Sequence, residues 1–318
     1  MEDTRPPEEF VSSHPPADRA RAWRLAALGL VLALLLVLAA GAWSLWRPLS
    51  DDDAARLAAR AATGSVRTQL HPNPWLLPED ALTRQLDAFG PPATPAQQRR
   101  LEERGAVAPA PPSLEAAADD LARLARSTED EHLTADLAAV AASWWAGAAS
   151  GRGADALSSQ DDARETEQET EGTGGAVTDR EDACGSGLTT AVTAVDRSLF
   201  TAETAAARTG PEAGTAGGLV DGAAELHRAA LSDPRVAPVL ECEPPPVAGH
   251  HELPPGVQED PVRALGRAEQ EARDTLVRAA ASSSGEQRAW ILEALRTAAR
   301  AGQVLDPEQP VPALPGRP

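Results

Sequence analysis

The longest run of apolar positions in the chain predicts a helix that crosses a membrane. Residues 25–46 carry no charged side chain. At 1.5 Å per residue they extend about 33 Å, which is enough to cross the hydrocarbon core of a bilayer. Trp23, Trp43 and Trp46 stand at the two ends of this run, where an interfacial belt of aromatic residues would lie. We therefore expect a transmembrane helix over residues 23–46.

The charges that flank the apolar run predict its orientation. Arg24 and other arginines precede it, and three aspartates follow it at residues 51–53. The positive-inside rule places the basic side in the cytoplasm. We therefore expect a single-pass protein of the cell membrane, with a disordered cytoplasmic tail over residues 1–22 and extracytoplasmic domains after the span. A cleaved signal peptide is the alternative, because residues 40–42, Ala-Gly-Ala, would suit a cleavage site.

Helical spacing after the span predicts a small helical module over residues 50–150. Ser50 is a candidate N-cap for a juxtamembrane helix over residues 50–63. Prolines then break the pattern, and short helices are expected over residues 79–89 and 95–104.

The second half of this module has the pattern of a helical hairpin. Leucines recur at helical spacing over residues 113–149, and Ser127 or Thr128 would cap the second helix. The adjacent Trp144 and Trp145 suit the core of the hairpin, and an exposed docking patch is the alternative.

An acidic segment separates this module from the rest of the chain. Residues 151–183 contain few large apolar side chains and many carboxylates. Such a composition does not bury enough surface to offset the entropy lost on ordering. We therefore expect a disordered linker here.

The pattern beyond the linker predicts four helices within residues 184–302. Apolar side chains recur at spacings of three and four in each of them. The four stripes begin at Leu188, Leu219, Val262 and Ile291. A long connection over residues 233–260 separates the second helix from the third, which is the connectivity of a ferritin-like four-helix bundle with one crossover. The Pro-rich tail, residues 303–318, should be irregular. Whether the bundle packs against the first module is left open by the sequence.

Several segments of this part resemble the actinobacterial ferritin-like domain family of unknown function. They are ELHRAAL (225–231), EPPPVAGHHELP (243–254), DPVRALGRAEQEA (260–272) and the Ala-rich fourth helix. The first helix departs from the family, because it holds Phe200 and Glu203 but lacks the tyrosine that members often carry. The resemblance implies a four-helix bundle in a secreted or membrane-linked protein, and it implies no established activity.

A ferritin-like bundle raises the question of a di-iron site. Such a site needs inward carboxylates on all four helices and Glu-x-x-His pairs on two of them. No Glu-x-x-His pair occurs in the four predicted helices. Glu203, His227 and Glu269 are the candidates nearest the apolar stripes, and they would suffice only for a weaker mononuclear site. We therefore expect no metal or other cofactor.

The two cysteines predict a disulfide bond. Cys184 precedes the first helix of the bundle and Cys242 follows the second, so an antiparallel pair brings both to one end. His250 and His251 are neighbours in the crossover, and their side chains should diverge rather than bind one ion.

Composition narrows the function classes. The net charge is −19, and no basic stripe is present for nucleic acid. No nucleophile elbow, phosphate-binding glycine loop or zinc-protease motif occurs. We therefore expect no enzyme but an interaction or structural module of the cell envelope, with an envelope protein as its partner. A degenerate ferritin-like protein that binds metal or protects against oxidation is the alternative.

Overall fold

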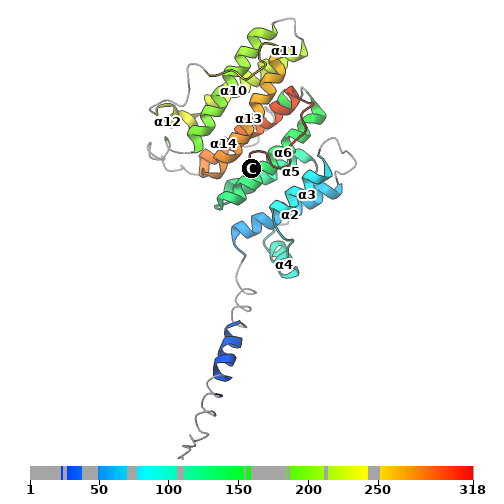
Figure 1. Ribbon diagram of the computed structural model, residues 1–318, viewed down its shortest axis with the longest axis vertical. Helices are drawn as coiled ribbons and strands as arrows, with labels where there is room; N and C mark the ends of the chain where they lie inside the picture. Colours follow the sequence, from blue (N-terminus) through cyan, green and yellow to red (C-terminus); the bar gives the residue numbers. More distant parts are fainter. Residues whose placement is uncertain are drawn as a thin grey trace, which may run out of the picture. The chain divides into compact units, whose positions relative to one another are not determined.

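The computed structural model describes most of the chain. The described residues are 23, 27–37, 49–69, 77–105, 111–153, 155–158, 184, 187–210, 214–242 and 251–317. Every regular element among them is helical (Figure 1). The prediction of an all-α fold is therefore confirmed for this part of the chain. Residues 1–49 and residues 50–318 form two compact units.

The first unit contains a short apolar helix. Residues 27–37 are helical, and their leucines and valines are exposed. None of the helices in the described ranges has both the length and the apolar character needed to span a membrane. Trp23 is described and exposed. Most of the remaining predictions for this region, including the tail over residues 1–22, fall outside the described residues. The same holds for Arg24, Trp43 and Trp46.

The second unit begins with three helices. They are α2 (Asp51–Gln69), α3 (Glu79–Ala88) and α4 (Pro95–Glu103). Ser50 caps α2 as predicted, because its Oγ accepts a hydrogen bond from the Asp53 amide at 3.0 Å. The helix is longer than the predicted 50–63, since it continues through Gly64. A glycine inside a helix costs about 1 kcal/mol, and the burial of Val66 beyond it offsets that cost.

The predicted hairpin is present. Its helices are α5 (Leu114–Ser127) and α6 (Glu131–Arg152). Trp144 and Trp145 are both buried in it, which confirms the core interpretation. The indole N–H of Trp144 donates to Gln85 Oε1 at 2.9 Å, and that of Trp145 donates to Asp119 Oδ1 at 2.8 Å. Each large apolar ring therefore carries a satisfied polar atom.

The cap between the hairpin helices differs from the prediction. The N-cap of α6 is Asp130, whose Oδ1 accepts a hydrogen bond from the Leu133 amide at 2.8 Å. Ser127 ends α5 and Thr128 follows it, and both hydroxyls donate to the Leu124 carbonyl. A carboxylate is favoured at this position because it also interacts with the positive end of the helix dipole.

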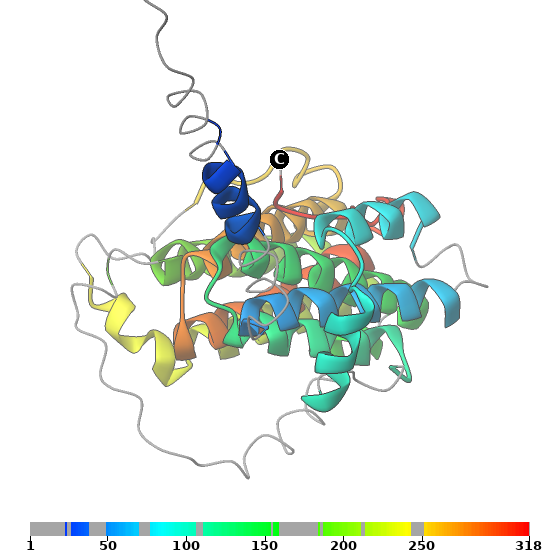
Figure 2. The same cartoon turned by 90° about the horizontal axis from the view of Figure 1, so that it is seen from below.

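Four helices follow in the predicted order. They are α10 (Gly187–Thr209), α11 (Thr215–Leu231), α13 (Pro261–Ala281) and α14 (Gly285–Leu305). The long connection between α11 and α13 contains η1 (Pro234–Val236) and α12 (Ala237–Leu240). α10 packs against α11 and α13, and α14 packs against α13 and α11, so the four helices form a bundle (Figures 1 and 2). Short, long and short connections thus occur as predicted.

The hairpin and the bundle share one core. α6 packs against both α13 and α14 (Figure 1). One apolar cluster contains Leu137 and Trp144 of the hairpin together with Leu276, Ile291 and Leu295 of the bundle. Every residue from 133 to 147 of α6 is buried, and a helix that is apolar on all sides must be covered on all sides. The question that the sequence left open is therefore answered, because the two modules pack together.

The predicted linker is ordered at its start. α6 runs to Arg152, and α7 (Asp155–Ser158) follows after a break. Leu157 is one of the few large apolar residues of the segment, and its side chain is buried in a second apolar cluster with Val220 and Leu265. Burial of this leucine explains why the prediction of disorder is wrong for residues 151–153 and 155–158. Residues 159–183 lie outside the described residues.

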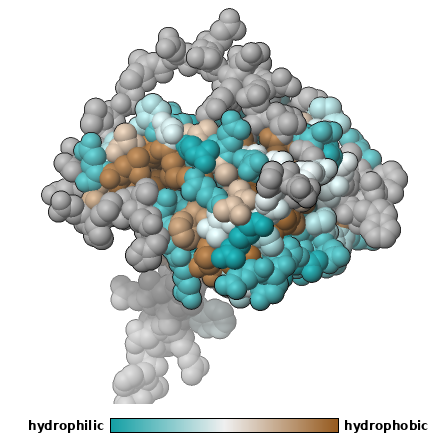
Figure 3. Space-filling model, turned by 90° about the horizontal axis from the view of Figure 1, so that it is seen from above, coloured by the Kyte–Doolittle hydropathy of each residue, from teal (hydrophilic) through white to brown (hydrophobic). Residues whose placement is uncertain are grey.

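The C-terminal tail also begins later than predicted. α14 continues to Leu305, and residues 306–317 form no further helix. This irregular segment packs on the unit, since Ala313 is buried and its carbonyl accepts a hydrogen bond from Gln85 Nε2 at 2.9 Å. On the face shown in Figure 3, the described apolar residues form separate patches among hydrophilic ones.

Candidate functional site

His227 of α11 and Glu269 of α13 form a hydrogen-bonded pair inside the bundle. The Nε2 atom of His227 lies 2.7 Å from Oε1 of Glu269. The two side chains are 1% and 0% exposed, respectively. The remaining polar atoms of the pair, His227 Nδ1 and Glu269 Oε2, are buried and have no hydrogen-bond partner in the described part of the chain. The pair is therefore closed to solvent, and only one of the two polar atoms of each side chain is hydrogen-bonded.

The positions of the two residues follow from the helices that carry them. Glu269 shares the apolar stripe of α13 with Leu265 and Leu276, so its predicted inward position is confirmed. His227, which the sequence places only near an apolar stripe, is fully buried on α11. Gly302 of α14 lies close to the pair, because a Cβ atom added there would be 3.4 Å from Glu269 Cβ. A small residue at this position therefore lets α14 approach α13 closely beside Glu269 and Gln270.

Glu203, the third candidate ligand, does not join the pair. Its carboxylate is half exposed on α10 and accepts a hydrogen bond from Arg228 Nη2 at 2.9 Å. Among the described residues, no group of three or more His, Cys, Asp or Glu side chains is arranged to hold a metal ion. An imidazole and a carboxylate can exchange a proton or orient a ligand, but a pair without exposed surface offers no route for a substrate.

The predicted disulfide joins the start of α10 to the crossover. The Sγ atoms of Cys184 and Cys242 are bonded, and their Cα atoms lie 5.6 Å apart. Cys242 is buried, and both cysteines contact the larger apolar cluster. The bond therefore fastens the crossover to the core.

His251 fastens the crossover at a second point. Its Nε2 lies 2.6 Å from Oδ2 of Asp196 on α10, and its ring meets Phe200 edge to face at 5.7 Å. The sequence did not identify Asp196, although a lone carboxylate beside Val192 and Val195 is a signal for a buried partner. His250 lies outside the described residues. A structural role for His251 follows, since its imidazole is already paired.

A cluster of arginines surrounds one carboxylate where α5, α6 and α14 meet. Glu115 Oε2 lies 2.6 Å from Arg152 Nη1, and Glu115 Oε1 lies 2.9 Å from Arg296 Nη2. Arg300 Nη2 contacts the same Oε1 atom. A second carboxylate, Asp119, lies 3.7 Å from Arg296. No sequence pattern predicts this cluster, because its members are far apart along the chain.

Burial shifts the ionisation of these arginines. It lowers the pKa of Arg300 to about 10. Burial also lowers the pKa of Arg152, and the positive charge of Arg296 lowers it further. The pKa of Arg300 therefore reflects its burial alone, whereas that of Arg152 also reflects repulsion from a neighbouring arginine.

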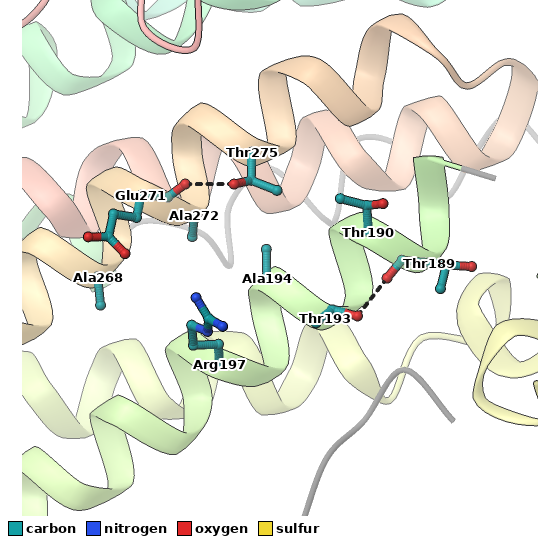
Figure 4. A pocket seen from close by; sticks show the side chains of 9 residues that line it. All are labelled: Thr189, Thr190, Thr193, Ala194, Arg197, Ala268, Glu271, Ala272 and Thr275. Atoms are coloured by element: carbon teal, nitrogen blue, oxygen red, sulfur yellow. Dashed lines mark hydrogen bonds between the residues drawn. The ribbon is translucent and has the colours of Figure 1, made fainter. Parts of the chain in front are cut away.

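An open groove of about 340 Å³ runs between α10 and α13 (Figure 4). Its lining is mainly small and hydroxyl-bearing: Thr189, Thr190, Thr193, Ala194, Arg197, Ala268, Glu271, Ala272 and Thr275. Thr193 and Thr275 donate their hydroxyl hydrogens to the carbonyls of Thr189 and Glu271 within their own helices. The groove offers hydroxyl oxygens and two side chains of opposite charge, which suits contact with a partner better than covalent chemistry.

Comparison of the chain with protein-family models, with curated proteins and with solved structures found no match. The resemblance to the ferritin-like family therefore stays a hypothesis that rests on the residues quoted above.

Proposed function

We propose that this chain is a membrane-anchored extracytoplasmic protein that serves the cell envelope by binding a partner or by a structural role, without catalysis. The observation that carries the proposal is the closed His227–Glu269 pair. The pair lies inside a four-helix bundle, where proteins of this architecture can hold a reactive centre, and its two side chains are 1% and 0% exposed.

Three features support an anchored protein with its C-terminal part outside the cytoplasm. Residues 25–46 form an uncharged run of sufficient length for a span. The bond between Cys184 and Cys242 is of a kind that forms and persists in oxidising compartments. The arginines before the run and the aspartates after it favour an external C-terminal part.

The partner in this proposal is an envelope protein that docks on the groove between α10 and α13. Arg197 and Glu271 are exposed there and present opposite charges. Opposite charges at the rim of a contact favour the orientation of a partner more than its affinity.

A reporter fused to the C-terminus tests the location. An enzyme that is active only outside the cytoplasm should be active in this fusion, and membrane fractions should retain it after a carbonate wash. An inactive reporter, with activity from a cytoplasmic reporter at the same position, would reverse the orientation. Release into the medium would favour the cleaved signal peptide.

A degenerate ferritin-like protein that binds metal is the second candidate. The unpaired His227 Nδ1 and Glu269 Oε2 favour it, because both are donor atoms that metals use. The exposed position of Glu203 counts against it. Metal content separates the two candidates.

A further inference from the structure

The arginine cluster around Glu115 contains more positive than negative charge. Arg296 and Arg300 lie one turn apart on α14, and Arg152 comes from the end of α6. Three guanidinium groups thus face Glu115 and its neighbour Asp119, and one Asp119 oxygen already accepts the indole N–H of Trp145. Counted over the described residues, the local charge is therefore positive, within a chain whose net charge is −19.

The hydrogen-bonding capacity of the cluster is also only partly used. Each guanidinium carries five N–H donors. Arg152 Nη2, Arg296 Nε and Arg300 Nε are buried and have no hydrogen-bond partner among the residues that the structure describes. Burial of unbalanced charge is costly, so an additional negative charge beside the partly exposed guanidinium groups of Arg152 and Arg296 would stabilise this arrangement.

The cluster is buried at Arg300 and partly exposed at Arg296 and Arg152. The Arg300 side chain is only 3% exposed, whereas those of Arg296 and Arg152 are 21% and 34% exposed. A small ion can therefore approach the guanidinium groups of Arg296 and Arg152 from solvent, while the buried Arg300 stays in contact with Glu115.

We propose that this cluster binds a small oxyanion of the phosphate type. Guanidinium groups match the paired oxygens of phosphate, and their charge-assisted hydrogen bonds are stronger than neutral ones. The oxyanion would lie against Arg152 and Arg296 at the junction of α5, α6 and α14. It would join the hairpin to the bundle by neutralising the positive charge between them.

Thermal unfolding of the full-length protein in detergent tests the proposal. Sodium phosphate should raise the midpoint in a saturable manner relative to sodium chloride at the same ionic strength. Arg152→Gln, which keeps a polar side chain at a partly exposed position, should remove the phosphate effect. Arg228→Gln removes an exposed arginine that pairs with Glu203 outside the cluster, so this control should keep the full effect.

Phosphorus NMR provides the direct readout. The phosphate signal should broaden with the wild-type protein and with Arg228→Gln, but not with Arg152→Gln. Glycerol phosphate in place of phosphate distinguishes a free ion from a phosphate group on a larger molecule, since tighter binding of the ester indicates the latter. If Arg152→Gln does not fold, as judged by circular dichroism, Arg296→Lys replaces it and should weaken binding at least several-fold. An equal response of the wild type and the cluster variants, or no response beyond that to chloride, would overturn the proposal.

Discussion

The second unit, residues 50–318, buries ionisable groups in two contrasting ways. His227 and Glu269 form a closed pair of one imidazole and one carboxylate in the bundle interior. The Glu115 cluster sets three arginines against two carboxylates and is open on one side. No ligand can reach the closed pair, whereas the open cluster has surplus positive charge and can bind an anion. We therefore assign a role in stability to the pair in the bundle interior, and a role in anion binding to the cluster at the junction with the hairpin.

Breaking the closed pair should have the largest effect. Glu269→Ala leaves His227 buried without its partner, and such a change lowers the free energy of unfolding by about 3–5 kcal/mol. Urea denaturation of the wild type and the variant measures this loss. The double variant His227→Leu with Glu269→Leu should recover part of it, because no buried polar group is then unpaired. Equal losses in the single and double variants would argue against a tightly coupled pair.

Loss of the disulfide bond should cause the second-largest loss of stability. Cys184 and Cys242 are separated by 58 residues, and removing a bond of this kind costs about 2–4 kcal/mol. Cys184→Ser should therefore lower the urea midpoint, and reduction of the wild type should give the same result. Intact mass after alkylation provides the control, since two free thiols in exported protein would contradict the bond.

A substitution in the Glu115 cluster should raise the free energy of unfolding, in contrast to the two changes above. Arg300→Met removes a buried positive charge but leaves Arg152 and Arg296 on Glu115. Replacement of unbalanced buried charge by an apolar side chain of similar size should raise the free energy of unfolding, by about 1 kcal/mol. Urea denaturation of the wild type and the variant in chloride buffer measures this gain. A large loss of stability would contradict it, because it would show that the positive and negative charges of the cluster already compensate one another.

A third ionic contact gives the smallest expected effect and a pH dependence. Asp136 on α6 lies 3.0 Å from Arg317, yet burial raises its pKa above the ordinary value of 3.8. The folded state therefore holds this proton more tightly than the unfolded state, so the contribution to stability falls as pH rises from 3.8 through the raised value. Asp136→Asn should be slightly more stable than the wild type at pH 7 and equal to it in acid. Thermal unfolding at both pH values checks this, and an advantage that persists in acid would contradict it.

Local order and connectivity were readable from the sequence. The apolar stripes at Leu188, Leu219, Val262 and Ile291 define the four bundle helices, and the order of helices and cysteines defines the disulfide. These features depend on residues that are close in sequence or on the ends of neighbouring helices. Such features carry a periodic or positional signal.

Contacts between the modules had no comparable signal. The Glu115 cluster combines residues from α5, α6 and α14, whose separation along the chain exceeds any helical period. The full burial of His227 depends on how α11 packs in the bundle, which is not contained in the α11 pattern alone. The ordered start of the acidic segment depends on a single side chain, Leu157.

Metal analysis of the full-length protein tests the central claim most directly. The whole chain is required, because α6 packs against α13 and α14 and residues 184–318 alone would lose that contact. Protein purified in detergent from metal-replete cells should contain well below one equivalent of iron, manganese or zinc, and His227→Ala should leave that content unchanged. One or more tightly bound equivalents in the wild type, lost in His227→Ala, would contradict the account and favour the metal-binding alternative.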